Sequence, residues 1–340
     1  MALPKESKQI IFVEKEKAEL QSVPLKAPGA GEITVRTTWT LISTGTETIC
    51  YGSRFDPGTH WANWIKFPFP PGYSHTGIVE AVGPGVTRYK AGDRVCSTHT
   101  HLQYITAPEN TFYPIVDGVS ERDAAWMTLS YIVQNGVRRA SHELGDDVAV
   151  IGLGPLGQLA VQFVKLLGAR RIIAIDPVGS RLEMAKAHGA THVLNVSVDQ
   201  ALEEVTKIVG ERLCDHVYDM TGNAKVFATA QQMLRKLGKL VLIGDTGSPA
   251  GQHLTGTVIT KSLQIIASHA MNTPPTDTVF AHWTRDNMIA LFQEYVRDGR
   301  MKVSDLNTHV FTPAECQVAY QKLLHDRAST MGCHFDWSKV

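Results

Sequence analysis

The fold of this chain is decided by the stretch VAVIGLGPLG at residues 148–157. Its first four residues form a continuous apolar run, as expected for a strand that is buried on both faces of a parallel sheet. The glycines that follow match the pattern G-x-G-x-x-G directly after the strand and at the start of a helix. Gly152 permits the tight turn, Gly154 lets the backbone approach a pyrophosphate, and Gly157 allows close packing of the helix on the strand. The stretch therefore predicts a dinucleotide-binding turn.

The residues around this turn complete the predicted nucleotide site. Pro155 and Leu156 begin the helix, whose N-terminus offers N–H groups and partial positive charge to the phosphates. Asp176 ends the next predicted strand, where a carboxylate accepts hydrogen bonds from the ribose hydroxyls and repels a 2′-phosphate. NAD(H) is therefore favoured over NADP(H). Arg181 flanks the adenine or opens the following helix, whereas Thr221 and Gly244 lie in loops at the carboxyl ends of later strands, where the nicotinamide is expected.

Strands and helices alternate along residues 148–267. Such alternation implies parallel strands with right-handed crossovers, a doubly wound sheet. We predict strands at 148–151, 171–175, 192–194, 216–219, 239–243 and 263–267, and helices at 155–167, 180–188, 198–209 and 224–237.

The rest of the chain lacks this regular alternation of strands and helices. Residues 1–115 contain short β-type runs broken by Gly and Pro, at 9–13, 32–39, 77–82 and 93–96. Two helices, at 287–297 and 313–324, and a β-like end at 333–337 follow the alternating region. We expect this tail to pack on the N-terminal domain.

Composition excludes several classes of function. The hydrophobic content of 43% fits a globular protein, and 33 basic residues balance 33 acidic ones, so no bulk attraction to nucleic acid or anionic membrane is expected. The five scattered cysteines are typical of reduced thiols. With no signal peptide and no apolar run long enough to span a membrane, the sequence predicts a cytoplasmic protein.

The order of these parts resembles the medium-chain dehydrogenase/reductase superfamily. The resemblance rests on residues 71–83 and 91–95, on the glycine turn, and on 188–190 and 308–311. It implies an α/β protein with a GroES-like catalytic domain at 1–138 and 273–340 and a Rossmann domain at 139–272. It also implies a small-molecule substrate, a homodimer or homotetramer, and a hydride transferred between NAD(H) and an alcohol or carbonyl.

Three departures from the zinc alcohol dehydrogenases of this superfamily bear on the chemistry. Thr44 stands at the usual cysteine ligand, Gly72-Tyr73-Ser74 replaces the G-H-E segment, and Thr128 lies where the third ligand is found. The four-cysteine structural lobe is also absent. Because zinc needs Cys, His or carboxylate donors, we predict that neither zinc site is present. The stretch 42–47 is similar to zinc-free, bacteriochlorophyllide-dehydrogenase-like members.

The sequence contains one candidate for a replacement metal site. Cys96, His99 and His101 lie close together, but in an extended segment His99 and His101 share one face while Cys96 points to the other. We therefore interpret them as polar side chains near a cleft or surface.

Without zinc, hydrogen-bond donors and a proton relay must stabilise the developing charge. Tyr73 is the candidate donor to an oxyanion, its phenol pKa lowered by the positive charge of the cofactor. Thr46 occupies the place of the hydroxyl that passes a proton in zinc members of the family. Glu47 and His75 are the candidate relay or supporting groups.

The segment 55–69 is rich in aromatic residues, among them Trp61 and Trp64. Such residues pack as core or interface, or else line the cleft beside Thr44, Ser74 and Thr128. In the second case the substrate is bulky, planar or a sugar ring.

The leading hypothesis is thus a zinc-independent NAD-linked dehydrogenase of a polyol, sugar or larger cyclic alcohol. The alternatives are a quinone or enoyl reductase, against which Asp176 argues, and a non-catalytic NAD(H)-binding protein.

Overall fold

The computed structural model describes residues 3–340 and divides the chain into two compact units. One unit joins the residues up to Thr128 with Ile289–Val340, and the other is the continuous segment Leu129–Met288. Residues from Ile289 onward therefore group with the N-terminal residues. The mixed α/β fold class predicted from the sequence is confirmed.

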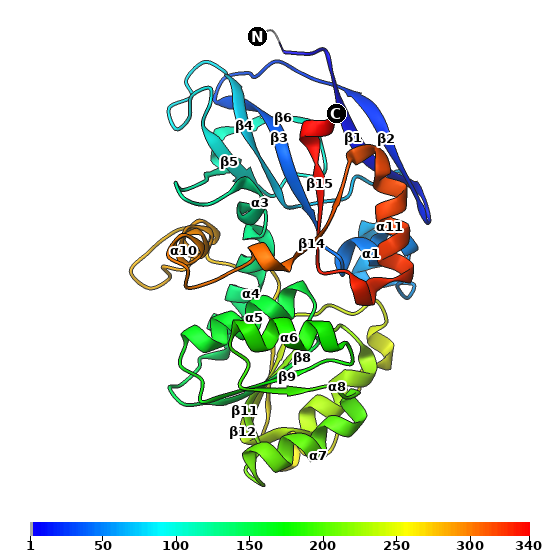
Figure 1. Cartoon of the computed structure of the whole chain (residues 1–340), viewed down its shortest axis with the longest axis vertical. Helices are drawn as coiled ribbons and strands as arrows, with labels where there is room; N and C mark the ends of the chain where they lie inside the picture. The colour runs from blue at the N-terminus through cyan, green and yellow to red at the C-terminus, as the bar shows by residue number, and fades with distance from the viewer. Residues whose placement is uncertain (1–2) are drawn as a thin grey trace. The chain divides into compact units, whose positions relative to one another are not determined.

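The second unit contains a six-stranded parallel sheet (Figure 1). Its strand order is β10-β9-β8-β11-β12-β13, so the chain runs outward from β8 on one side and from β11 on the other. This is the order of a doubly wound sheet, which binds ligands where the strand order reverses. The strands are β8 (Asp147–Ile151), β9 (Arg171–Ile175), β10 (His192–Leu194), β11 (Cys214–Asp219), β12 (Leu234–Leu242) and β13 (Gln264–Ala267).

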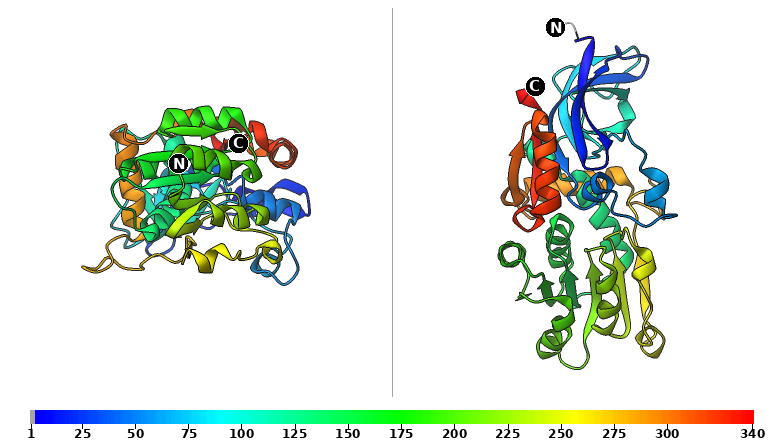
Figure 2. Two further views of the ribbon diagram at one scale, coloured as in Figure 1. Left: turned by 90° about the horizontal axis from the view of Figure 1, so that it is seen from below. Right: turned by 90° about the vertical axis from the view of Figure 1, so that its right-hand side faces the viewer.

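Helices cover both faces of this sheet (Figure 2). The helices α5 (Pro155–Leu166) and α6 (Gly179–His188) contact each other, as do α7 (Val198–Val209) and α8 (Ala224–Gln232). On the α7–α8 side, Ala149 and Ile151 of β8 pack in one apolar cluster with Val205 and Phe227. The neighbouring Val148 and Val150 are equally buried. Burial on both faces explains the uninterrupted apolar runs of the strands. A short helix, α9 (Thr257–Thr260), precedes β13.

The end of one predicted helix is wrong. The helix expected at 224–237 ends at Gln232, and Leu234 already pairs with Cys214 as the first residue of β12. The register of β12 against β11 shifts after this pair, and Leu237 adopts a positive φ of 59°. The segment is thus an irregular strand, because the burial of Leu234 and its pairing with Cys214 outweigh the helical propensity of the local sequence.

The first unit is built on a seven-stranded sheet and a two-stranded hairpin (Figure 1). The order of the larger sheet is β14-β15-β3-β4-β5-β7, with β6 also pairing with β3. The strands of this unit are β1 (Glu6–Glu14), β2 (Lys17–Pro24), β3 (Glu32–Ile42), β4 (His75–Val82), β5 (Arg94–Ser97), β6 (Tyr104–Pro108), β7 (Phe112–Pro114), β14 (Asn307–Phe311) and β15 (Gly332–Asp336).

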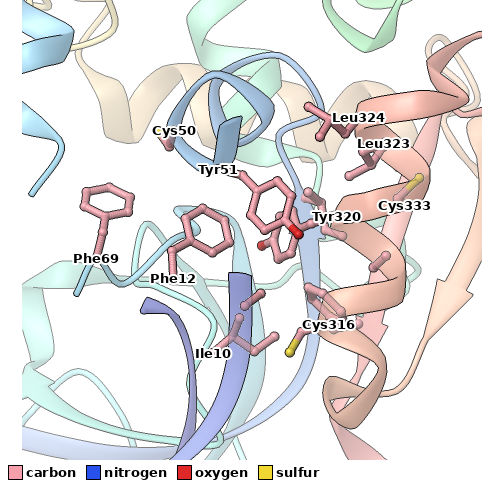
Figure 3. Packing of buried hydrophobic residues seen from close by; sticks show 14 of the residues in the cluster. Ile10, Phe12, Cys50, Tyr51, Phe69, Cys316, Tyr320, Leu323, Leu324 and Cys333 are labelled. Atoms are coloured by element: carbon pink, nitrogen blue, oxygen red, sulfur yellow. The ribbon is translucent and has the colours of Figure 1, made fainter. Parts of the chain in front are cut away.

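An aromatic core joins the two ends of the chain in this unit (Figure 3). The ring of Phe12 meets that of Tyr320 edge-on at 4.6 Å, and Tyr51 stacks on Tyr320 with 5.4 Å between ring centroids. Such pairs stabilise a core beyond their burial alone. The helices of this unit are α1 (Thr46–Gly52), α2 (His60–Trp64), α3 (Glu121–Ala124) and α11 (Cys316–His325).

Two helices lie where the units divide. These are α4 (Met127–Ala140) and α10 (Arg285–Arg297), and the division falls after Thr128 and after Met288, whereas the sequence places the domain limits at 138 and 272. The Gln134 side chain donates to the carbonyl of Met288 at 2.7 Å, and Asn135 donates to that of His269 at 3.1 Å. These bonds explain why most of α4 groups with the second unit.

Within residues 3–340, no helix combines the length and the apolar character that crossing a bilayer requires. All five cysteines are free and buried.

Candidate functional site

The glycine turn has the geometry that a dinucleotide requires. Gly152 has a φ of 88°, and a Cβ there would lie 2.6 Å from Cγ2 of Thr221. A Cβ on Gly157 would lie 2.0 Å from the carbonyl oxygen of Gly152, so the start of α5 packs directly on the turn. Gly154 is the N-cap of α5 and supplies no side-chain cap, and a Cβ there would meet no atom within 4 Å. The uncapped helix end and the free space fit a pyrophosphate.

Asp176 lies at the end of β9 and is 3% exposed. Its Oδ2 accepts a hydrogen bond from the N–H of Leu153 at 2.7 Å, and its Oδ1 accepts one from Val178 at 2.8 Å. Arg181 Nη1 lies 3.7 Å from Oδ2. The carboxylate therefore braces the glycine turn, a role that the sequence reading did not include. Arg181 forms an ion pair with this carboxylate and lies in the first turn of α6.

The loops after β11 and β12 meet the glycine turn. Thr221 donates from its hydroxyl and its N–H to Asp219 Oδ1, at 2.7 and 2.8 Å. Burial raises the pKa of Asp219, opposed by these hydrogen bonds. A Cβ on Gly244 would lie 2.5 Å from the nitrogen of Gly222. The contact between Gly152 and Thr221 and the close approach at Gly244 bring the predicted cofactor residues of three loops together. Asp219 fixes Thr221 in this loop; the sequence places Asp219 at the end of its strand but gives it no role.

The first unit contains a cavity of about 240 Å³ beside α1. Four residues predicted from the sequence, which come from three segments, line this cavity. Cys50, Phe69 and Thr100 also line it. The four predicted residues are Thr46, Glu47, Trp64 and Tyr73.

Tyr73 follows Gly72, whose φ of 98° directs the chain along the cavity wall. The phenol donates a hydrogen bond to the hydroxyl of Ser43, and the carbonyl of Tyr73 accepts one from Thr128 at 2.6 Å. Burial raises the pKa of Tyr73, and hydrogen bonds to Ser43 and Thr46 only partly oppose this. The phenol is therefore protonated at neutral pH, in contrast to the lowered pKa predicted for the cofactor-bound enzyme.

Glu47 is 1% exposed and accepts three hydrogen bonds. Its Oε1 accepts from the N–H of Ser43 at 2.8 Å, while Oε2 lies 3.0 Å from Nε2 of His101 and accepts from the Tyr320 hydroxyl at 2.6 Å. Both α1 and α11 are thus tied to His101 through one carboxylate. The sequence grouped His101 with Cys96 and His99 and contained no signal for Tyr320, which lies far away along the chain.

His75 is fully buried in β4 and is not part of the cavity wall. Its Nδ1 bonds to Ser97 Oγ and its Nε2 to Thr37 Oγ1, each at 2.9 Å. Burial lowers the pKa of His75 well below its usual value. The imidazole is neutral and both nitrogens are engaged, as in a core histidine, while its role as a relay stays a prediction.

The other predicted pocket residues are buried, but they do not line the cavity. Trp61 packs in the aromatic core, whereas Trp64 is half exposed and contacts Phe69 edge-on at 5.3 Å. The aromatic segment 55–69 therefore contributes side chains both to the core and to the cavity lining. The other three residues that the sequence assigns to the pocket are also buried, and these are Thr44, Ser74 and Thr128.

The residues around Tyr73 do not fit a zinc ion. Across residues 3–340, three or more His, Cys, Asp or Glu side chains come within ligating distance of one another only at His142, Asp146 and His216, in the other unit. His101 is directed to Glu47, and His99 bonds to Ser97 at 2.9 Å. Cys96, His99 and His101 thus do not converge.

Comparison with known families agrees with this architecture. Residues 29–117 match the family described as the alcohol dehydrogenase GroES-like domain. Residues 155–284 match the family described as zinc-binding dehydrogenase. The two matches stand in the order of the two folds and together cover well over half of the chain.

Characterised relatives are dehydrogenases. A sorbitol dehydrogenase of Bacillus subtilis is 29% identical over 53% of this chain and 60% of its own length, so less than two thirds of that protein is spanned. A D-guloside 3-dehydrogenase of Escherichia coli is 28% identical over 75% of this chain and 73% of its own.

Solved structures show the same fold over the full length. An alcohol dehydrogenase of Escherichia coli in complex with NADH is 20% identical with a TM-score of 0.81, covering 98% of this chain and all of the other. A Sinorhizobium meliloti protein described as a zinc-binding dehydrogenase and bound to NADP is 16% identical with a TM-score of 0.79, covering 98% of this chain and 100% of the other. The chain is therefore an oxidoreductase that belongs to the medium-chain dehydrogenase/reductase superfamily, with a GroES-like and a Rossmann-type domain.

Proposed function

We propose that this enzyme is a zinc-independent, NAD(H)-linked dehydrogenase that interconverts a hydroxyl and a carbonyl group on a polyol, a sugar or a larger cyclic alcohol. The observation that carries the proposal is the cavity in which Thr46, Glu47 and Tyr73 meet without a set of zinc ligands. The relatives that act on sorbitol and on a guloside support the substrate class. Thr44, Tyr73 and Thr128 stand where zinc ligands are expected and are poor donors for zinc, which supports the metal independence.

The chain's own residues supply polarisation and proton transfer in this proposal. A nicotinamide held by the glycine turn would supply the hydride donor or acceptor. In the reducing direction, the protonated Tyr73 gives its proton to the developing alkoxide oxygen of the substrate. The Ser43 hydroxyl, to which Tyr73 is hydrogen-bonded, and the nearby Thr46 hydroxyl are the groups that pass a proton back to the phenol. In oxidation the proton follows the same hydroxyls in reverse.

The cavity wall suits a carbon-rich ring or chain with hydroxyl groups. Trp64 and Phe69 form an aromatic corner, and Thr46, Thr100 and Tyr73 present hydroxyls. Aromatic faces pack on the C–H faces of sugars, while hydroxyls fix orientation. The test is a screen of polyols, sugars and aromatic alcohols with NAD⁺ and NADP⁺, followed by the absorbance of reduced nicotinamide. Turnover confined to NADPH with quinones or enoyl compounds would contradict the proposal.

The expected setting is a homodimer or homotetramer in the cytoplasm that acts on a small molecule, with no nucleic-acid or membrane partner. The free, buried state of all five cysteines supports a reducing compartment.

Metal removal is expected to leave the activity intact. Treatment with EDTA should change kcat by less than about twofold, because a catalytic zinc would contribute several kcal/mol and its loss would cost far more. The measurement is steady-state turnover of the identified substrate before and after chelation, at a temperature well below unfolding. A large loss that added Zn²⁺ restores would rule out the zinc-independent mechanism.

The charge of Asp176 is expected to set the preference for NAD⁺. In Asp176→Asn, one side-chain oxygen can still brace the turn, but the repulsion of a 2′-phosphate is lost. Two unit charges about 4 Å apart repel by roughly 1–4 kcal/mol near a protein surface, so the ratio of kcat/KM for NAD⁺ to that for NADP⁺ should fall by about tenfold or more. The exposed Asp199→Asn is the matched control and should leave the ratio unchanged. An unchanged ratio in Asp176→Asn would show that other groups select the cofactor.

A further inference from the structure

A cluster of two histidines and one aspartate lies at the opposite end of β8 from the glycine turn. His142 and Asp146 belong to the loop between α4 and β8, and His216 belongs to β11, where it is the register partner of Val148. The exposed fractions of the three side chains are 3%, 10% and 5%. The proposed hydride transfer uses none of them.

The spacing of the three side chains matches that of metal ligands. Asp146 Oδ2 lies 3.2 Å from Nδ1 of His142 and 3.2 Å from Nδ1 of His216. The two imidazole rings lie 4.1 Å apart. Around a tetrahedral Zn²⁺ with bonds of about 2.0–2.1 Å, neighbouring ligand atoms are about 3.3 Å apart. Small side-chain adjustments would therefore place all three atoms around one ion.

The hydrogen bonds of the cluster leave the contact between His216 Nδ1 and Asp146 Oδ2 without a proton to share. His216 Nε2 lies 3.1 Å from the carbonyl of Ala140, which can only accept, so Nε2 carries the proton. In a neutral His216, Nδ1 then presents a lone pair to the carboxylate of Asp146. Nδ1 is buried and has no hydrogen-bond partner among residues 3–340. Two lone pairs facing each other repel, and a cation between them would turn this contact into two bonds.

The outer contacts also resemble those of a metal site. Ligating histidines usually donate their other N–H to a carbonyl, a carboxylate or a similar acceptor, which orients the ring. The Nε2–H of His216 donates to Ala140, and Nε2 of His142 lies 2.6 Å from the hydroxyl of Tyr218. Burial lowers the pKa of both imidazoles, that of His142 to about 4, which favours the neutral form that binds metals. The ammonium of Lys239 also donates to the Ala140 carbonyl, at 2.6 Å. Its positive charge lowers the affinity of the cluster for a metal cation.

The geometry points to a divalent transition-metal site formed by His142, Asp146 and His216, with Zn²⁺ as the ion that fits two imidazoles and a carboxylate. The ion ties the loop before β8 to β11 and so fastens two central strands of the sheet at their N-terminal ends. Its role is structural, and it is independent of the proposed hydride transfer.

The test is metal binding by the whole chain. Protein stripped with a chelator is titrated with Zn²⁺ against a coloured indicator, and its unfolding temperature is followed at each addition. We expect one equivalent to bind and to raise the unfolding temperature, because an ion that binds only the folded state stabilises it. Co²⁺ should give the visible d–d bands of a tetrahedral site. In His216→Gln, affinity should fall by more than the roughly 10–100-fold caused by loss of an outer contact.

Matched variants separate this site from other sources of binding. His253→Gln removes an exposed imidazole of the same unit, and Glu47→Gln removes the carboxylate of the cavity; both should still bind one equivalent. Asp146→Asn, almost unchanged in shape, provides a second disrupted site if His216→Gln does not fold by circular dichroism. Stripped wild type that takes up no Zn²⁺ and gives no Co²⁺ bands would overturn the site. So would a folded His216→Gln that binds as tightly as wild type.

Discussion

Replacement of Glu47 by alanine is expected to lower the free energy of unfolding by about 3–5 kcal/mol. The carboxylate is buried with His101 and Tyr320, and its removal leaves their polar atoms and the N–H of Ser43 without an acceptor. Neither water nor another side chain reaches the site easily, because His101 and Tyr320 are both fully buried. In a unit of this size the loss corresponds to a fall in Tm of roughly 6–20 °C.

Thermal and urea unfolding followed by circular dichroism measure this effect. Glu14→Ala, which removes an exposed glutamate of the same unit paired with Lys17, should change stability by less than about 0.5 kcal/mol. Tyr320→Phe removes one donor and keeps the carboxylate, so its cost should be about 1–3 kcal/mol. A Glu47→Ala protein as stable as Glu14→Ala would show that the three hydrogen bonds do not hold α1 and α11 in place.

Replacement of Tyr73 by phenylalanine is expected to lower kcat by about 10²–10⁴-fold, the range for loss of a general acid–base group. The ring still fills its place on the cavity wall, so KM should change much less than kcat. The physical reason is that the substrate oxygen loses its proton donor while the residues around the cavity keep their positions.

Steady-state kinetics on the identified substrate measure this effect, with NADH binding as a check that the cofactor site is intact. Tyr89→Phe removes a tyrosine hydroxyl that donates to the carbonyl of Phe112, away from the cavity, and should retain nearly full kcat. A Tyr73→Phe enzyme with the kcat of the wild type would exclude Tyr73 as the acid. The proton donor would then be sought among Ser43 and Thr46.

Local patterns were sufficient to predict the nucleotide half. A glycine turn between an apolar strand and a helix is determined by a few consecutive residues, and the structure has β8, α5 and β9 close to the predicted limits. The failure at 224–237 has the opposite cause. There the pairing of Leu234 with Cys214, a long-range contact, outweighs the helical preference of the local sequence.

The cavity of the first unit was only partly predictable for the same reason. Thr46 and Tyr73 could be found from the positions they occupy in the motifs, because each stands in a recognisable segment. Tyr320 and His101 could not, because their relation to Glu47 exists only after α11 has packed on α1. The segment that leads into β4 shows that residues close along the chain can lie in different surroundings. His75 lies two residues from Tyr73, yet its ring is enclosed between Ser97 and Thr37.

The pairing of β15 with β3 has a consequence for the order in which the chain folds during synthesis. The Rossmann unit is one continuous segment, so all of it is present once Met288 has been made. The GroES-like unit lacks β14, α11 and β15 until the last residues are added, and Glu47 has no Tyr320 partner until then. Domains usually fold from the N-terminus onward as they leave the ribosome. In this protein the middle of the chain can be finished first, and the GroES-like unit is completed only when β14, α11 and β15 pack on its N-terminal strands.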